Sequence, residues 1–178
     1  MDKRANSATV DFIILMGPPG AGKTYLAKRL RDEHACRYSE LEPQLLARFG
    51  TGPEFAQNKR QALQFTESAL RAQHAHAGRP VIVESTGLSD RDILLRLQRD
   101  FRLLFVKVLP AVETCVARVE RRAAGANLNN DPAFARSFHE FWQLEVATQY
   151  EFDLCIRNET EDTEAGLAAI VRLLATSE

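Results

Sequence analysis

Apolar residues in this chain gather in short runs that alternate with longer stretches of helical periodicity. The runs are continuously apolar, which is typical of strands buried on both faces of a parallel sheet. The stretches between them repeat apolar positions every three or four residues, which is typical of amphipathic helices. This pattern predicts strands at 11–16, 37–39, 80–84, 103–109 and 153–156, and helices at 23–34, 43–49, 54–77, 114–124 and 132–150, with one more capped by Ser89 or Asp90 and another that closes the chain.

Strands that alternate with helices specify a parallel sheet covered by helices on both faces, which is an α/β fold. A chain of 178 residues is most economically one domain, which we place at 10–178 behind a polar, flexible tail at 1–9. Ligands of such sheets bind beyond the carboxyl ends of the strands. We therefore expect the functional residues to follow the first three strands.

Composition and charge narrow the class of partner. The net charge is −1 and the isoelectric point is about 6.4, so no overall positive field attracts nucleic acid. No apolar stretch approaches the length of a membrane span, and we expect no membrane partner. Cys36, Cys115 and Cys155 are odd in number and far apart, which disfavours a disulfide framework or a metal site. We expect buried thiols and a cytoplasmic location.

The strongest motif directly follows the first strand. The sequence Gly-Pro-Pro-Gly-Ala-Gly-Lys-Thr fits the phosphate-loop pattern G-x-x-x-x-G-K-[ST] at every fixed position. Backbone amides of the glycine-rich loop and the positive end of the next helix attract phosphate oxygens. In such loops the lysine reaches the β- and γ-phosphates, and the threonine hydroxyl binds Mg²⁺. The predicted nucleotide site comprises Gly17, Pro18, Pro19, Gly20, Ala21, Gly22, Lys23, Thr24 and Tyr25.

A second signal is the acid that ends the third predicted strand, Glu84. A carboxylate at the end of a buried apolar run is costly unless a partner compensates its charge. Beside a phosphate loop that partner is usually Mg²⁺, held directly or through water. We therefore predict that Thr24 and Glu84 hold Mg²⁺, and that Lys23 and Glu84 belong to the catalytic set.

Three segments together resemble a known group of proteins. They are the phosphate loop, the run Gly-Arg-Pro-Val-Ile-Val-Glu-Ser-Thr at 78–86, and Arg-Val-Glu-Arg-Arg at 118–122. In this combination the chain resembles the small P-loop kinases. These are the adenylate-kinase-like and gluconate/shikimate-kinase-like proteins, including polynucleotide-kinase-like and zeta-toxin-like members that are often labelled AAA-type ATPases. The resemblance implies a three-layer P-loop NTPase fold with a five-stranded parallel sheet, order 2-3-1-4-5, and a short lid.

The resemblance also implies roles for residues beyond the phosphate loop. Arg118 and Arg122 are four positions apart and share a helix face. By resemblance, Arg118 stacks on adenine and Arg122 stabilises the phosphoryl group during transfer, and we count both as catalytic. A planar and permanently charged guanidinium suits both tasks. Asn158 follows the last strand, where the group often places its adenine pocket.

The acceptor side departs from the pattern of the group. The group usually has aspartate where Glu84 stands, and it often carries Asp-x-x-Arg after the second strand. This chain has Glu40 and Glu42 in that region, and we take Glu40 first and Glu42 second as the acid that activates the acceptor. The remaining candidate acceptor contacts are Arg48, Arg60, Thr86 and Arg91.

These residues predict an ATP- and Mg²⁺-dependent phosphotransferase acting on a small molecule, with a hydroxyl as the acceptor. Two alternatives share the site: a nucleoside monophosphate kinase, which needs an arginine cluster for the acceptor phosphate, and a polynucleotide 5′-hydroxyl kinase, which needs a basic groove. An alternative of another class is a switch module, in which bound ATP orders a surface for a partner protein. We expect a monomer or a homodimer.

Overall fold

Five parallel strands form one sheet in the order β2-β3-β1-β4-β5, as predicted. The computed structural model describes residues 9–50, 52–121, 131–159 and 162–176. Most of the predicted tail 1–9 and the loop at 125–130, where we expect the tip of the lid, therefore lie outside the described residues. The strands are β1 (Phe12–Met16), β2 (Arg37–Tyr38), β3 (Val81–Ser85), β4 (Leu103–Val108) and β5 (Leu154–Ile156).

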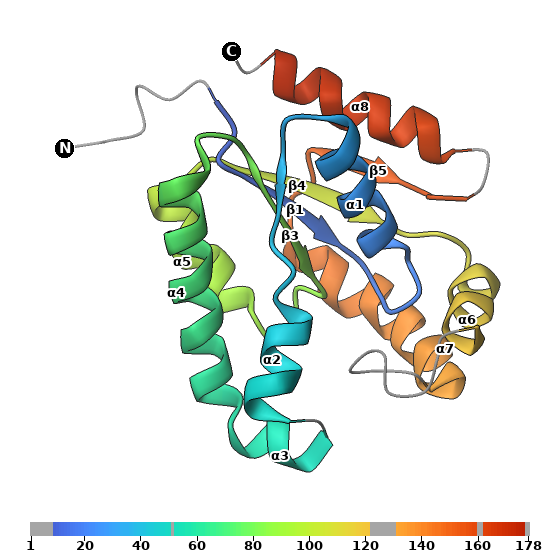
Figure 1. The fold of residues 1–178 in the computed structure, drawn as a ribbon. Helices are drawn as coiled ribbons and strands as arrows, with labels where there is room; N and C mark the ends of the chain where they lie inside the picture. Colours follow the sequence, from blue (N-terminus) through green and yellow to red (C-terminus); the bar gives the residue numbers. More distant parts are fainter. Residues whose placement is uncertain (1–8, 51, 122–130, 160–161, 177–178) are drawn as a thin grey trace.

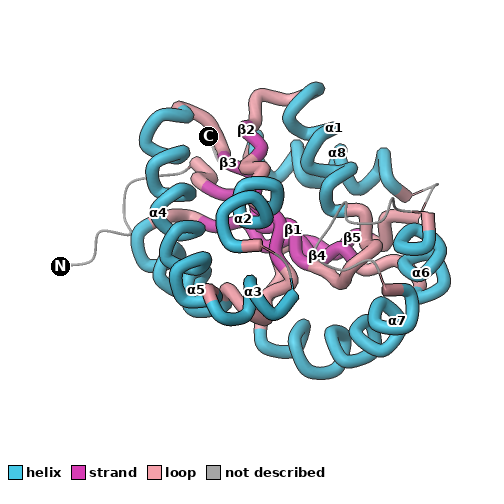
Figure 2. Tube along the Cα trace, turned by 60° about the horizontal axis from the view of Figure 1, so that its bottom comes forward, coloured by secondary structure: helices cyan, strands magenta, loops and turns pink. Residues whose placement is uncertain are grey.

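Helices cover both faces of the sheet, which gives three layers (Figures 1 and 2). One face carries α1 (Lys23–Glu33) and α8 (Thr163–Ala175), and the other carries α4 (Lys59–Ala77), α5 (Arg91–Asp100) and α7 (Pro132–Phe141). Three further helices lie toward the carboxyl ends of the strands: α2 (Glu42–Phe49), α3 (Gly52–Gln57) and α6 (Val112–Glu120).

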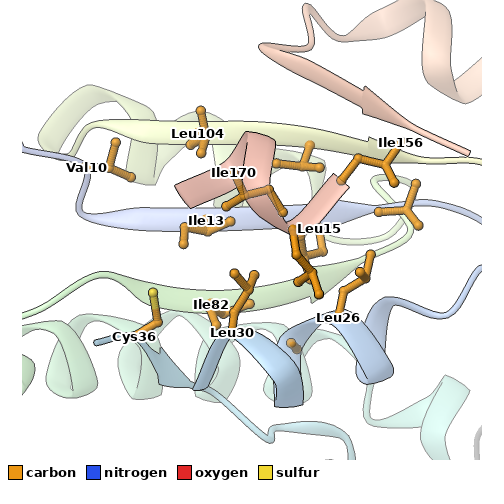
Figure 3. Close-up of a cluster of buried hydrophobic side chains, with 14 of the residues drawn as sticks. Val10, Ile13, Leu15, Leu26, Leu30, Cys36, Ile82, Leu104, Ile156 and Ile170 are labelled. Carbon is orange, nitrogen blue, oxygen red and sulfur yellow. The ribbon is translucent and has the colours of Figure 1, made fainter. Parts of the chain in front are cut away.

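The central position of β1 in the sheet explains why its sequence is continuously apolar. Its side chains alternate between two buried clusters, because successive residues of a strand point to opposite faces. Ile13 and Leu15 pack with α1 and α8 (Figure 3), while Phe12, Ile14 and Met16 pack against α4 and α5. All five residues have no exposed surface, so neither face of this strand tolerates a polar residue.

The prediction of one long helix at 54–77 is wrong, because this segment forms two helices, α3 and α4, that meet at Asn58. The Asn58 side chain donates to the carbonyl of Glu54 at 3.1 Å, and its backbone N–H donates to the same oxygen at 3.2 Å. Asparagine competes in this way with regular helical hydrogen bonding. The polypeptide therefore turns between α3 and α4, a change that apolar periodicity does not reveal.

The second long helix, predicted at 132–150, also changes form. The α-helix ends at Phe141, and a π-helical turn, Trp142–Val146, and a 3-10 turn, Ala147–Gln149, follow it. Trp142 is fully buried in this widened turn, and its indole N–H donates to the carbonyl of Thr86 at 2.7 Å.

Among the cysteines, Cys36 and Cys115 are buried as predicted, whereas Cys155 is exposed, since it lies on the edge strand β5.

The turn between β3 and α5 is fixed from several directions. Tyr150 donates its hydroxyl to the carbonyl of Gly87 at 2.5 Å. The Ser85 hydroxyl accepts from the Gly87 N–H at 2.6 Å and donates to the Asp90 carboxylate at 2.9 Å. Asp90 stands at the N-cap position of α5, as one of the two predicted caps, but its side chain makes no capping hydrogen bond to the helix. Burial raises the pKa of its carboxyl, although the Ser85 hydroxyl and the charge of Lys23 oppose this rise.

The raised pKa of Asp90 predicts a pH-dependent stability. The folded state holds this proton more tightly than the unfolded chain does, so stability from this group is greatest below the ordinary pKa and falls as the pH rises through the raised value. We expect Asp90→Asn, which removes the charge, to raise the free energy of unfolding at pH 7 by about 1 kcal/mol. Denaturant titrations at several pH values should show this gain shrinking toward pH 4. Asp92→Asn, an exposed neighbour, should show no such trend, and an unchanged gain at all pH values would contradict the prediction.

Candidate functional site

The loop between β1 and α1 has the backbone of an anion cradle. Gly20 and Gly22 have φ angles of +81° and +87°, a region that side chains disfavour. A Cβ atom on Gly20 would lie 2.3 Å from the carbonyl oxygen of Cys115, so the loop also packs too tightly for a larger residue. Within the described residues, α1 has neither a capping side chain nor an acid in its first turn. Its N-terminal N–H groups and its dipole are therefore directed toward an anion.

The lysine of the loop lies along its own backbone. The Lys23 ammonium donates to the carbonyl of Gly17 at 2.8 Å and to that of Pro18 at 3.0 Å. These contacts hold one positive charge at the mouth of the cradle, beside the N-terminus of α1. Tyr25, which we included in the predicted nucleotide set, is 52% exposed on α1 and accepts a hydrogen bond from Arg29.

The predicted second acid lies directly beside the loop. The Thr24 hydroxyl donates to Glu84 Oε2 at 2.9 Å, and the hydroxyl of Tyr38 donates to Glu84 Oε1. Burial and the negative charge of Glu84 raise the pKa of the Tyr38 phenol, so it stays protonated and acts as a donor near neutral pH. One carboxylate thus joins three elements, β3, α1 and β2.

This oxygen-rich arrangement fits Mg²⁺ better than a softer metal. Among the residues that the structure describes, no group of three or more His, Cys, Asp or Glu side chains forms a metal cage. Mg²⁺ commonly binds one or two protein oxygens and takes its other ligands from phosphates and water. The hydroxyl of Thr24 and the carboxylate of Glu84 supply such a pair at the edge of the cradle.

The other side of the loop is held by Arg118 and Asn158. Arg118 donates through Nη2 to the Asn158 carbonyl at 2.9 Å and through Nη1 to the Ala21 carbonyl at 3.3 Å. The Asn158 amide donates to the same Ala21 oxygen at 2.7 Å, and its own oxygen accepts from Thr163 at 3.0 Å. Asn158 is buried with a φ of +52°, and its side chain is used to fix the loop.

The candidate acids of the acceptor side lie farther out. Glu40 is exposed and accepts a hydrogen bond from Arg31 at 2.9 Å. Glu42 is partly buried at the first position of α2. Arg122, the second predicted lid arginine, lies outside the described residues.

The candidate acceptor contacts lie in two adjoining grooves, which share Gln64, and in the turn that leads into α5. Arg48 stacks over the ring of Phe65 at 5.0 Å in a groove of about 530 Å³ between α2 and α4. Arg60 lines a second groove of about 630 Å³, which runs from α3 and α4 to α5. Arg91 is exposed at the start of α5, and Thr86 lies in the turn that Trp142 fixes. The phosphate loop, Glu84, Arg118 and Asn158 therefore lie together, whereas Arg48 and Arg60 line different, adjoining grooves.

Sequence reasoning missed two residues near the loop. Tyr38 was assigned no role, although its position at the end of β2 beside β3 was a usable signal, because the carboxyl ends of neighbouring parallel strands converge. Asp90 was considered only as a helix cap, and its contact with Ser85 depends on the tight turn at Gly87.

Several solved structures share this fold at low sequence identity. The shikimate kinase from Acinetobacter baumannii in complex with shikimate is 18% identical with a TM-score of 0.63, and the match covers 96% of both chains. A gluconokinase from Sinorhizobium meliloti 1021 is also 18% identical with a TM-score of 0.61, again over 96% of both chains. The deoxyadenosine kinase from M. mycoides with bound dATP is 12% identical with a TM-score of 0.52, over 93% of this chain and 99% of that one.

A family model also matches most of the chain, whereas a search of curated proteins does not find a match. No helix among the described residues has the length and apolar character that crossing a bilayer requires. The model of the AAA domain family matches residues 12–137, which is well over half of the chain and contains the phosphate loop, Glu84 and Arg118. The chain therefore belongs to the AAA domain family, and it has the fold of the small P-loop kinases.

Proposed function

We propose that the protein is an ATP- and Mg²⁺-dependent phosphotransferase that moves the γ-phosphoryl group to a hydroxyl of a small molecule. The observation that carries this proposal is the Thr24–Glu84 hydrogen bond of 2.9 Å at the edge of a glycine-rich anion cradle. A cradle alone binds a phosphate. The added hydroxyl–carboxylate pair supplies the oxygen ligands that Mg²⁺ uses beside the β- and γ-phosphates.

Phosphoryl transfer requires mainly that the protein position the reacting groups and stabilise the charge on the transferring phosphoryl group. The acceptor oxygen bonds to the γ-phosphorus as the bond from that phosphorus to the bridging oxygen breaks, ADP leaves, and a carboxylate takes the hydroxyl proton. Lys23 and the first-turn N–H groups of α1 would hold the phosphates, and bound Mg²⁺ would neutralise charge on them. Glu40 remains our first candidate for the proton acceptor and Glu42 our second. Both oxygens of Glu84 already accept hydrogen bonds, which suits a role toward the metal.

The contacts of Arg118 support a role in binding adenine. Carbonyl oxygens of the loop and of Asn158 occupy the edge of its guanidinium group. Such contacts fix the plane of the group, and a fixed plane can stack on a base through its face. Asn158 stabilises this arrangement through its own hydrogen bond to the carbonyl of Ala21.

A hydroxyl acceptor fits the described residues better than a nucleoside monophosphate. A monophosphate needs several arginines converging on one phosphate, whereas Arg48 and Arg60 line different grooves. The net charge of −1 offers no general attraction for a polynucleotide. The named substrates of the similar structures, shikimate among them, are consistent with a small acceptor.

Phosphoryl transfer can be tested with a panel of acceptors. We expect ADP release from Mg²⁺-ATP to rise with one member of a panel of hydroxyl metabolites, nucleosides, nucleotides, antibiotics and 5′-hydroxyl oligonucleotides. Lys23→Ala should lower the rate at least about 100-fold, because it removes a charge aimed at the transferring group. ATP binding without stimulation by any acceptor would contradict the kinase proposal and favour the switch module.

The proposed contact of Arg118 with adenine can be tested separately from phosphate binding by the loop. We expect Arg118→Ala to raise the KM for ATP about tenfold with a smaller fall in kcat, because stacking on the base contributes to ground-state binding. Arg118→Lys should rescue little, since an ammonium group lacks the planar fork. Arg136→Ala is the matched control, because this exposed arginine makes only a 3.5 Å contact with Glu113 among the described residues. An unchanged KM for ATP in Arg118→Ala would exclude the adenine contact.

A further inference from the structure

We propose that Tyr38 is a positioning residue that sets the Glu84 carboxylate for Mg²⁺-nucleotide. This inference rests on the proposed Mg²⁺-ATP site and adds a residue to it. Tyr38 belongs neither to the phosphate loop nor to β3, which carries Glu84. It reaches the site from the neighbouring strand β2.

Two different donors occupy the two oxygens of Glu84. The Tyr38 hydroxyl donates to Oε1, and the Thr24 hydroxyl donates to Oε2 at 2.9 Å. Tyr38 pairs with Ile82 in the register of β2 and β3, so its side chain extends past the end of its own strand toward Glu84, two residues farther along β3. Each oxygen of the carboxylate is therefore held by a different element, and Oε2 accepts from the threonine of the phosphate loop.

The length of the glutamate side chain explains why such a partner is useful. A glutamate has one more rotatable bond than the aspartate that is usual here, so an unanchored carboxylate would sample more rotamers. Glu84 is only partly buried, so packing restricts its side chain less than it would restrict a fully buried one. The tyrosine ring suits the task, because it packs against the buried cluster of α1 and α8 and has only two side-chain torsions.

The position of the hydroxyl determines which property should change. The Tyr38 hydroxyl donates to Oε1, whereas the Thr24 hydroxyl donates to Oε2, and the side chains of Tyr38 and Thr24 also lie within hydrogen-bonding reach of each other. Loss of its hydroxyl leaves the glycine loop, Lys23 and Arg118 in place but frees the carboxylate to rotate away from Thr24. Affinity for the nucleotide with Mg²⁺ should fall, whereas affinity for the nucleotide alone should not.

The test measures nucleotide binding against free Mg²⁺ with the full chain. A fluorescent ATP analogue is titrated in EDTA and at a series of Mg²⁺ concentrations, for wild type, Tyr38→Phe, Glu84→Ala and the double variant. We expect Tyr38→Phe to raise the Mg²⁺ concentration for half-saturation about tenfold, which corresponds to one hydrogen bond to a charged group. Binding in EDTA should change less than twofold. In the Glu84→Ala background, Tyr38→Phe should add less than a twofold effect.

Tyr150→Phe is the matched control, because it removes another half-buried tyrosine hydroxyl, one that donates to a backbone carbonyl instead of a carboxylate. It should leave the Mg²⁺ dependence unchanged, and the melting temperatures of both tyrosine variants report any general loss of folding. Equal losses for Tyr38→Phe in EDTA and in Mg²⁺, or an undiminished loss in the Glu84→Ala background, would overturn the inference. These binding measurements need no acceptor, so a failure to find phosphoryl transfer would overturn the proposed function and leave this result intact.

Discussion

The parallel pairing of β1 with β3 is the constraint on which the rest of the site depends. Its register sets Leu15 beside Glu84 and Met16 beside Ser85, so the phosphate loop begins level with the end of β3. The N–H of Gly17 donates to the carbonyl of Ser85 at 3.3 Å, which extends this pairing into the loop. The first turn of α1 thus begins where its threonine reaches the carboxylate of β3. A shift of one residue would turn Glu84 toward the other face of the sheet.

The sequence was sufficient to predict the fold and to place the candidate nucleotide residues at one edge of the sheet, because both depend on local signals. Continuous apolar runs identified the strands to within about one residue at most ends, since β1 and β3 are buried on both faces. The glycine motif specified its own loop. The general rule for parallel sheets then placed Glu84 at the same edge as Thr24, which the 2.9 Å contact confirms.

The features that the sequence did not reveal depend on contacts between distant segments. The break at Asn58 uses a side-chain hydrogen bond that competes with the helix, and the widened turn at Trp142 serves a contact with Thr86. Cys155 is exposed because β5 ends the sheet, which its apolar neighbours do not indicate. Tyr38 lies in a strand of two residues, too short for a periodic pattern, and its partner is 46 positions away.

The candidate nucleotide half and the candidate acceptor half of the site therefore depend on different kinds of interaction. Main-chain geometry, strand register and buried hydrogen bonds fix the candidate nucleotide half, where side chains donate to several backbone carbonyls of the loop. The candidate acceptor half consists of side chains on α2, α4 and α5 and in the segments that precede α2 and α5, and several of these side chains are exposed. Substitutions there leave the main-chain contacts of the cradle in place. Kinases named for different substrates share this fold with the chain at 12–18% identity, so the fold alone does not specify which molecule the candidate site takes.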